Sequence, residues 1–391
     1  MRAFAMLKYL AGKGQVTLVG LSDRLPYKEE SLPTLKPYCE KVVVVHRAGP
    51  QDQESDLGQA WKTRVADFLK TNPWDLLYGF CPEFDEAVRA TQPETFDLIV
   101  ANRFPMMEYL LRHPKAEVLL KRTAIDVDDV VLRQYEQKMR ALASLRKRAK
   151  HWVGVLMMKR FYRRMNRAFA CFTVSEVDQT YLLRNRLAKQ VFVVPNTVPV
   201  NGEAAFPPRE NDRPNLLFIG TLGYRPNEEA VSFFCERVFP LIQKRRPDAQ
   251  FTVVGPHASE KILRFAQQPG VRFAGFAPST KPFYDQATLA VVPLLNGTGT
   301  RIKILEAMAF QKPVVSTSIG CEGLEVTHGE NILVADDPEK FAEYCVALIQ
   351  NPEQRTVLAA KGHQLVKDRY DTPVFHRALD AFLDAYLKEA R

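Results

Sequence analysis

A glycine-rich loop followed by two cations and a carboxylate is the part of this sequence best suited to chemistry. Glycines in the loop 296–300 let the backbone approach a ligand closely. Arg301 and Lys303 add positive charge where a helix is expected to begin, and the free N–H groups of a helix start favour an anion. Glu306 lies further along that helix and can accept hydrogen bonds from sugar hydroxyls. The spacing predicts a phosphate or diphosphate site; the alternative is a loop that only caps a core helix.

The segments on either side of this loop favour the binding site. An apolar run at 289–295 leads into the loop, and a β-branched run at 313–316 follows the helix at once. Strand, loop, helix and strand in this order form the repeating unit of a parallel α/β sheet. Such sheets bind ligands outside the carboxyl ends of their strands, which is where the loop lies.

The same alternation runs through the chain and predicts two doubly wound, Rossmann-like α/β domains with parallel sheets. Strands are expected at 16–21, 42–45, 76–80, 97–101, 118–125, 171–174 and 191–194 in the first half, and at 216–219, 250–254, 271–274, 289–292, 313–316 and 332–335 in the second. The proline-rich stretch between the halves is typical of a linker. The expected organisation is an N-terminal domain over 1–200, a linker over 201–213, a second domain over 214–371 and a C-terminal helix over 372–391.

Composition limits the class of protein. Of the 391 residues, 46% are apolar and 25% charged, as in a soluble globular enzyme. The six cysteines lie far apart and form no metal-ligand spacing with the seven histidines, so we expect a reduced, cytoplasmic setting and no metal site. No apolar run reaches the roughly 18 residues that span a bilayer. The stretch 1–21 is typical of an amphipathic helix and a strand rather than a signal peptide.

The net charge of +9 comes from one segment. Residues 133–167 contain twelve Lys or Arg and only Glu136 as an acid, so this segment carries +11 and the rest of the chain −2. Bulky apolar residues such as Trp152 and Phe161 lie among these cations, a pattern that fits an anionic membrane surface. Twelve cations also suit nucleic acid, but no nucleic-acid fold signature is present, and we expect no nucleic-acid partner. The remaining alternative is an ordinary solvated face.

The second half resembles a known family. The strings LLFIGTLGYRPNEEAV (216–231), FTVVG (251–255), VRFAGF (271–276), LEAMAFQKPVVSTSIGCEGL (305–324) and NILVADD (331–337) occur in the order found in retaining GT-B glycosyltransferases with the EAMA helix, the family 4-like or group 1 enzymes. The resemblance extends from about 215 to 370. It implies two Rossmann-like domains with a cleft between them, and a C-terminal helix that packs back onto the N-terminal domain.

The resemblance also implies a nucleotide-sugar site. Glu306 matches a glutamate that binds ribose hydroxyls in the family, although the alternative is a surface glutamate on the helix. The residues that the resemblance assigns to the donor are Gly220, Thr221, Arg225, Gly255, Phe276, Gly297, Thr298, Gly299, Thr300, Arg301, Lys303 and Glu306. For Arg225, the alternative is a solvated loop residue.

Polar residues at strand ends mark the acceptor side of the first domain. Asp126 and Asp128 follow the strand expected at 118–125, and one of them is a candidate to orient an acceptor hydroxyl or accept its proton. The alternative is that one of them caps the next helix. Asn102 and Arg103 end the preceding strand, and Asn196 lies in a turn that resembles the family's VPN turn, or is a plain hinge.

The chain departs from the family at three places. Thr298 stands where the first glutamate of the family's E-x7-E pattern would be, which leaves the donor sugar to hydroxyls and backbone N–H groups. The loop 221–227 lacks the Arg and Lys that many relatives use for the diphosphate. The N-terminal domain begins in the family's first helix, so its first strand is expected to be missing and an N-terminal segment lost.

We therefore expect a metal-independent hexosyltransferase that needs no cofactor and takes a nucleotide-diphosphate sugar as its donor. The acceptor would be a glycan or a lipid-linked precursor in polysaccharide biosynthesis. The protein would be cytoplasmic, or peripheral on the inner membrane face through 133–167. Two alternatives stay open: a nucleotide-sugar epimerase on the same fold, and a degenerate scaffold without catalysis.

Overall fold

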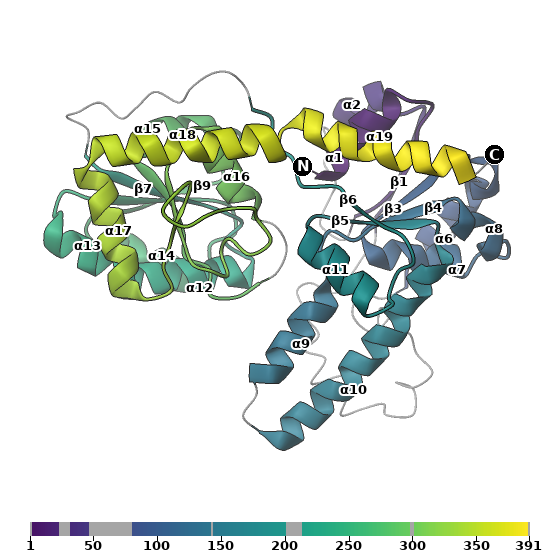
Figure 1. The fold of residues 1–391 in the computed structure, drawn as a ribbon, viewed down its shortest axis with the longest axis horizontal. Coiled ribbons are helices and arrows are strands. Elements are labelled where there is room, and N and C mark those ends of the chain that lie inside the picture. The colour runs from purple at the N-terminus through teal and green to yellow at the C-terminus, as the bar shows by residue number, and fades with distance from the viewer. Residues whose placement is uncertain are drawn as a thin grey trace. The chain divides into compact units, whose positions relative to one another are not determined.

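The chain folds into two compact units. The computed structural model describes residues 2–22, 32–46, 80–141, 144–200, 213–297 and 301–389. Unit 1 comprises Met1–Val193 and Phe382–Arg391, and unit 2 comprises Val194–Ala381 (Figure 1). Within the described ranges, no helix is long and apolar enough to cross a membrane.

Unit 2 is built on a six-stranded parallel sheet in its described part. Its strands are β7 (Asn215–Ile219), β8 (Gln250–Val254), β9 (Val271–Gly275), β10 (Leu289–Val292), β11 (Val314–Ser316) and β12 (Leu333–Val334). They lie in the order β12-β11-β10-β7-β8-β9. The chain runs outward from β7 to β9 and then returns to place β10 on the other side of β7. The switch point of this doubly wound sheet is therefore between β7 and β10, where ligands bind in folds of this kind.

Helices cover both faces of the unit 2 sheet (Figure 1). They are α12 (Arg225–Phe233), α13 (Phe239–Arg245), α14 (Glu260–Leu263), α15 (Lys281–Gln286), α16 (Ile302–Ala309), α17 (Pro338–Gln350) and α18 (Pro352–Arg369). Strand residues such as Leu216, Phe218 and Phe251 are fully buried between them. Because both sheet faces are covered, the strands are mostly apolar, and all four residues of β10 are buried and apolar.

Unit 1 contains two parallel sheets in its described part. One pairs β1 (Thr17–Ser22) with β2 (Lys41–His46); the other has the order β3-β4-β5-β6, with bounds Ile99–Asn102, Thr123–Asp126, Ala170–Thr173 and Val191–Val193. The helices of this unit are α1 (Arg2–Ala11), α2 (Leu32–Leu35), α6 (Pro82–Ala90), α7 (Met107–Leu111), α8 (Ala116–Lys121), α9 (Val131–Ala141), α10 (Leu145–Tyr162) and α11 (Glu176–Arg184). Among the described strands, β1 and β3 do not pair with each other.

The last helix, α19 (Thr372–Glu389), contributes its C-terminal part to unit 1. The Phe382 ring packs edge-on against Phe172 of β5, with ring centroids 4.7 Å apart. The Tyr386 hydroxyl donates a hydrogen bond to the Asp97 carbonyl oxygen. Aromatic burial and one backbone contact thus attach this end of the chain to the four-stranded sheet.

The sequence predicted the strands of unit 2 to within one residue at each end, and the α/β fold is confirmed. The strand expected at 118–125 is wrong in its first half, because 116–121 form α8 and only Thr123–Asp126 form β4. Leu119 and Leu120 are buried while Glu117, Val118 and Lys121 are exposed, which is helical rather than strand periodicity. Most of the strand expected at 76–80 and of the linker expected at 201–213 lies outside the described residues.

Candidate functional site

The backbone at the ends of β7 and β8 is packed closely enough to require glycine. The Gly220 N–H donates to the Val254 carbonyl oxygen at 2.9 Å. Gly255 has φ +155°, and a Cβ at this position would lie 1.9 Å from the Gly220 carbonyl oxygen. No side chain fits at Gly255. We call the paired backbone of Gly220 and Gly255 the shelf; Gly220 directly follows β7, one of the two strands at the switch point.

The side-chain amine of Lys303 lies against this shelf. Lys303, from the first turn of α16, donates a hydrogen bond from Nζ to Asn227 Oδ1 at 2.7 Å, and its Nζ lies 4.3 Å from the centroid of the Phe218 ring. Asn227 is buried in α12 and donates from Nδ2 to the Thr221 carbonyl oxygen at 2.8 Å. A Cβ on Gly220 would lie 2.8 Å from the Lys303 Nζ. Three elements therefore fix the position of the amine.

The surroundings of Lys303 make its charge responsive to a ligand. Burial, together with the nearby Arg301 guanidinium, lowers the pKa of the Lys303 ammonium to about 7, and Glu306 opposes this shift. An anion at the shelf would favour the protonated form. Among the described residues, no group of three or more His, Cys, Asp or Glu is placed to hold a metal ion. Side chains and the start of α16 supply positive charge here.

Glu306 lies one turn beyond Lys303 on α16. Its carboxylate is hydrogen-bonded by the buried Tyr284 hydroxyl of α15, and the Tyr284 ring stacks on Phe310 at 4.7 Å. Burial raises the pKa of Glu306, while the Lys303 ammonium opposes the rise. A carboxylate held from one side by a tyrosine keeps acceptor capacity for a hydroxyl on the other side.

The start of α16 brings Arg301 against Gly297, where a Cβ would lie 2.6 Å from the Arg301 Nη2. Gly297 has φ +112°, a conformation that favours glycine. The loop is also attached at its beginning, because Asn296 Nδ2 donates to Glu229 of α12. Thr298, Gly299 and Thr300 lie outside the described residues.

Three other predicted donor residues lie at the edge of this region. Arg225 is 74% exposed and forms an ion pair with Glu229 at 2.7 Å, so its guanidinium is engaged along α12 rather than over Gly220. Thr221 is exposed and contributes its carbonyl oxygen to Asn227. Phe276 follows β9 and is 72% exposed, a free aromatic face of the size of a nucleotide base.

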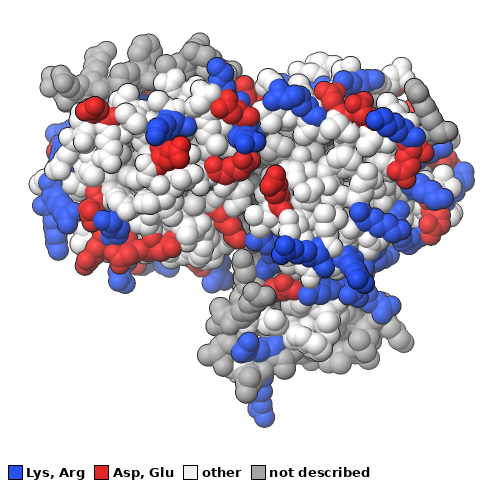
Figure 2. Space-filling model, viewed as in Figure 1, with Lys and Arg blue, Asp and Glu red and all other residues white. Residues whose placement is uncertain are grey.

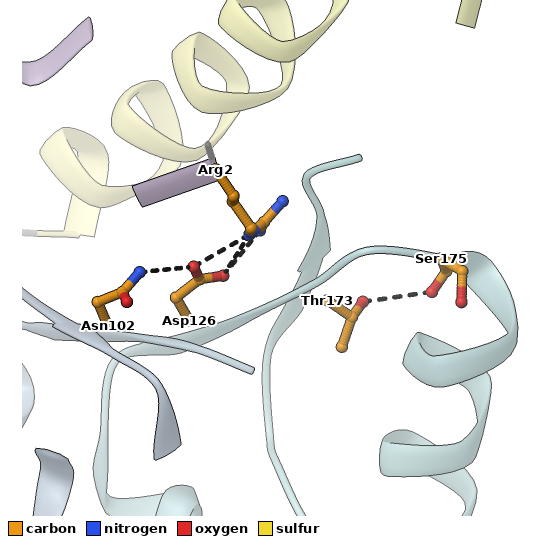
Figure 3. Close-up of polar contacts among 5 residues, drawn as sticks. All are labelled: Arg2, Asn102, Asp126, Thr173 and Ser175. Atoms are coloured by element: carbon orange, nitrogen blue, oxygen red, sulfur yellow. Dashed lines mark hydrogen bonds and ion pairs between the residues drawn. The ribbon is translucent and has the colours of Figure 1, made fainter. Parts of the chain in front are cut away.

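In unit 1, the predicted residues divide into a buried ion pair and a more open carboxylate. Asp126 ends β4 and is fully buried; Arg2 of α1 binds it with Nη2 2.7 Å from Oδ1, and Asn102 Nδ2 donates to Oδ2 at 3.1 Å (Figure 3). Its carboxylate is thus occupied by two partners. This contact network attaches α1 to the ends of β3 and β4, a structural role that the sequence did not indicate.

Asp128 lies two residues beyond the end of β4 and is partly exposed. Burial raises the pKa of Asp128, and the Arg2 guanidinium opposes the rise. Arg103 has φ +68° and donates its N–H to the Asp126 carbonyl oxygen at 3.1 Å. Asn196 is buried at 2% exposure and belongs to unit 2, since the division falls after Val193.

The neighbouring strand end carries a helix cap. Ser175 Oγ accepts from the Asp178 N–H at 3.2 Å at the start of α11. Thr173 Oγ1 of β5 donates to the Ser175 carbonyl oxygen at 3.3 Å (Figure 3). The hydroxyls at this strand end are therefore used to begin a helix.

Sequence reasoning missed Asn227, Tyr284 and Arg2, each of which holds a predicted residue in place. Asn227 follows Pro226 at a helix start, a position that looks like an ordinary first turn. Tyr284 lies 22 residues from Glu306 and Arg2 lies 124 residues from Asp126. No local spacing links such pairs.

The sequence is similar to one family model and to one curated protein. Residues 213–351 match the family model described as glycosyl transferases group 1. A protein of Klebsiella pneumoniae, described as an uncharacterized 44.6 kDa protein in the cps region, is 25% identical over 65% of this chain and 68% of that protein. The residues that match this model all lie within unit 2.

Solved structures show the fold of both units. The sucrose-phosphate synthase of Thermosynechococcus elongatus is 18% identical with a TM-score of 0.68, covering 99% of this chain and 92% of that one. Anabaena Alr3699/HepE, solved in complex with UDP and glucose, is 16% identical with a TM-score of 0.63, covering 98% and 95%. TarM is 14% identical with a TM-score of 0.55, covering 74% and 54%, so this chain spans about half the length of TarM. The fold is that of a GT-B glycosyltransferase.

Proposed function

We propose that this protein is a retaining glycosyltransferase that moves a sugar from a nucleotide-diphosphate sugar to a polysaccharide or lipid-linked acceptor. The observation that carries the proposal is the Lys303 amine held over Gly220 at the switch point, inside the segment that matches the group 1 model. A diphosphate is the ligand that an ammonium, an arginine and a helix start at one strand end suit best.

The chemistry follows from where charge develops. As the bond between the sugar C1 and the diphosphate oxygen breaks, negative charge grows on the diphosphate. Lys303, Arg301 and the backbone N–H groups at the start of α16 would stabilise this charge, and such stabilisation is usually the largest catalytic term. The acceptor hydroxyl would attack C1 on the face that the diphosphate leaves, and a leaving diphosphate oxygen would take the hydroxyl proton.

Glu306 would accept hydrogen bonds from the ribose hydroxyls of the nucleotide, with Tyr284 holding the carboxylate from behind. The exposed Phe276 ring would contact the base. On the acceptor side, Asp128 would orient the hydroxyl, because Asp126 is already engaged by Arg2 and Asn102.

Two comparisons support the substrates. The relative encoded in a cps region favours a polysaccharide product. Alr3699/HepE was solved with UDP-glucose, which makes UDP-glucose the first donor to test here. We place the reaction on the cytoplasmic side, at the inner face of the membrane when the acceptor is lipid-linked.

A thermal-shift panel of UDP, GDP, ADP and dTDP sugars on the wild type, Lys303→Met and Glu306→Ala tests the donor site. A ligand at 100 times its dissociation constant adds about 2.7 kcal/mol, a shift of a few degrees. One nucleotide sugar should raise the melting temperature of the wild type and lose this effect in both variants. No rise with any of them would contradict a donor site.

Product analysis then distinguishes a retaining glycosyltransferase from an epimerase and from a scaffold without catalysis. With the selected donor and a glycan acceptor, NMR should show the donor's anomeric configuration preserved in the product. Conversion of the donor without an acceptor would instead identify an epimerase, and donor binding with no turnover on any acceptor would identify a scaffold.

A further inference from the structure

The helix α10 carries an exposed ridge in which apolar residues lie between arginines. Trp152 and Leu156 are 54% and 43% exposed and lie one helical turn apart. Arg148 precedes them by one turn, and Arg160 and Arg163 follow them on the same side; all three are exposed. Four of these residues lie on α10 and Arg163 directly follows it, so the five side chains form one stripe about 22 Å long. We call these five residues the α10 ridge.

The opposite face of α10 accounts for the helix's own packing. Val155, Met158, Phe161 and Tyr162 are buried in the core of unit 1. Lys159 faces α9, where it forms an ion pair with Glu136 at 2.7 Å. The ridge is therefore not needed to hold the helix in the fold.

Four cations of the basic segment outside the ridge form ion pairs with acids: Arg133, Lys159, Arg164 and Arg167. Arg133 pairs with Asp178, Arg164 with Glu108, and Arg167 with Glu117, at 2.6, 3.0 and 2.6 Å. None of the acidic residues in the described ranges forms an ion pair with the arginines of the ridge. Figure 2 shows Lys and Arg atoms beside uncharged ones over the part of unit 1 that includes α10.

We infer that the α10 ridge docks on a membrane surface rich in anionic lipid, with Trp152 and Leu156 entering the interface and the three arginines contacting lipid phosphates. Tryptophan prefers the level of the headgroups, and arginine stems can lie along apolar surface while the guanidinium reaches phosphate. The groove of unit 1 lined by Arg133, Lys159 and Arg184 among others is a separate feature and contains no ridge residue.

The test is co-sedimentation of the full chain with vesicles of phosphatidylcholine, with and without phosphatidylglycerol. The wild type should bind the anionic vesicles about tenfold or more better, and salt should weaken this binding. Trp152→Ser with Leu156→Ser should lower binding about tenfold, and Arg148→Gln with Arg160→Gln and Arg163→Gln should remove the preference for phosphatidylglycerol.

Matched variants separate the ridge from general surface effects. Leu183→Ser changes a leucine on α11 that is also 43% exposed, and Lys41→Gln with Lys121→Gln and Lys189→Gln removes three exposed charges elsewhere in unit 1. Both should bind as the wild type does. If vesicle binding fell as much in these control variants as in the ridge variants, the proposal would be wrong, because exposed charge and apolar surface anywhere on unit 1 would then explain the binding.

A direct reading of insertion comes from Trp152 itself. In a Trp61→Phe, Trp74→Phe background it is the single tryptophan, and its emission should shift to shorter wavelength and be quenched by brominated lipid. Binding of single-stranded RNA that depends on the three arginines but not on Trp152 or Leu156, without any emission shift on vesicles, would assign the ridge to nucleic acid instead.

Discussion

Lys303 Nζ lies 2.7 Å from Asn227 Oδ1, and this contact joins the first turn of α16 to the first turns of α12 across the ends of β7 and β10. The amide both accepts from the lysine and donates to the Thr221 carbonyl oxygen. The position of the amine at the switch point therefore depends on a residue 76 positions away in the sequence.

The first prediction concerns pH. With a pKa of about 7 in place of 10.5, the Lys303 amine is neutral above pH 7 in the free protein, so a diphosphate must then bind together with a proton. Donor affinity should be constant below about pH 7 and fall up to about tenfold per pH unit above it. Calorimetry in buffers of different ionisation enthalpy measures the proton uptake, with the nucleotide sugar that the thermal-shift panel selects.

Two variants control this prediction. The arginine in Lys303→Arg keeps its charge at every pH, so donor affinity should not change with pH. Asn227→Asp should raise the pKa of the lysine and move the decrease in donor affinity to higher pH.

The stability of the free protein changes in the opposite direction. The unfolded lysine holds its proton up to about pH 10.5, so the contribution of Lys303 to the free energy of unfolding rises between pH 7 and 10.5. Lys303→Met should remove that rise.

The second prediction concerns Glu306. Glu306→Ala should weaken donor binding about 10- to 100-fold, because a hydrogen bond from a ligand hydroxyl to a charged group contributes about 1.5–3 kcal/mol. Glu306→Gln keeps an acceptor for Tyr284 and should preserve the melting temperature while still losing affinity. Equal donor affinity in Glu306→Gln and the wild type would argue that the carboxylate charge does not contact the nucleotide.

The third prediction separates two glycines of the shelf. Gly255→Ala places a Cβ 1.9 Å from the Gly220 carbonyl oxygen at a positive φ, and should cost about 3–5 kcal/mol of unfolding free energy. Gly220→Ala meets only the ends of the Lys303 and Asn227 side chains at 2.8 Å, which can move. It should cost about 1 kcal/mol or less, yet weaken donor binding about tenfold. Urea unfolding and the thermal-shift panel measure the two effects.

The fourth prediction concerns the buried pair in unit 1. Arg2→Ala and Asp126→Ala should each lower the free energy of unfolding by about 3–5 kcal/mol, because each leaves an uncompensated buried charge. The double variant should cost clearly less than the sum, which a double-mutant cycle in urea measures. Additive costs would mean that the two side chains act independently.

Asp128→Asn provides the comparison for catalysis. Its carboxyl is partly exposed, so we expect a change of less than about 1 kcal/mol in stability but a lower kcat. A loss of kcat in Asp126→Asn at unchanged stability, with full activity in Asp128→Asn, would reverse the assignment of these two carboxylates.

Local sequence determined most of the fold. Runs of β-branched and aliphatic residues gave the strands of unit 2 because a parallel strand buried on both faces must be apolar along its length. The prediction from local sequence is wrong at 118–120, because two adjacent leucines fit either a strand or a helix. Leu119 and Leu120 are buried in the unit 1 core as part of α8.

The sequence by itself also indicated the region that we propose for the donor, since Gly297, Arg301, Lys303 and Glu306 lie within one loop and one helix. Only the tertiary structure decided what these residues touch. Asn227 under Lys303, Tyr284 behind Glu306 and Arg2 on Asp126 come from distant segments, and a hydrogen bond depends on separation in space rather than along the chain. Burial, which lowers the pKa of Lys303, and the contacts of Arg2 and Asn102 with the Asp126 carboxylate exist only once the sheets and helices have packed.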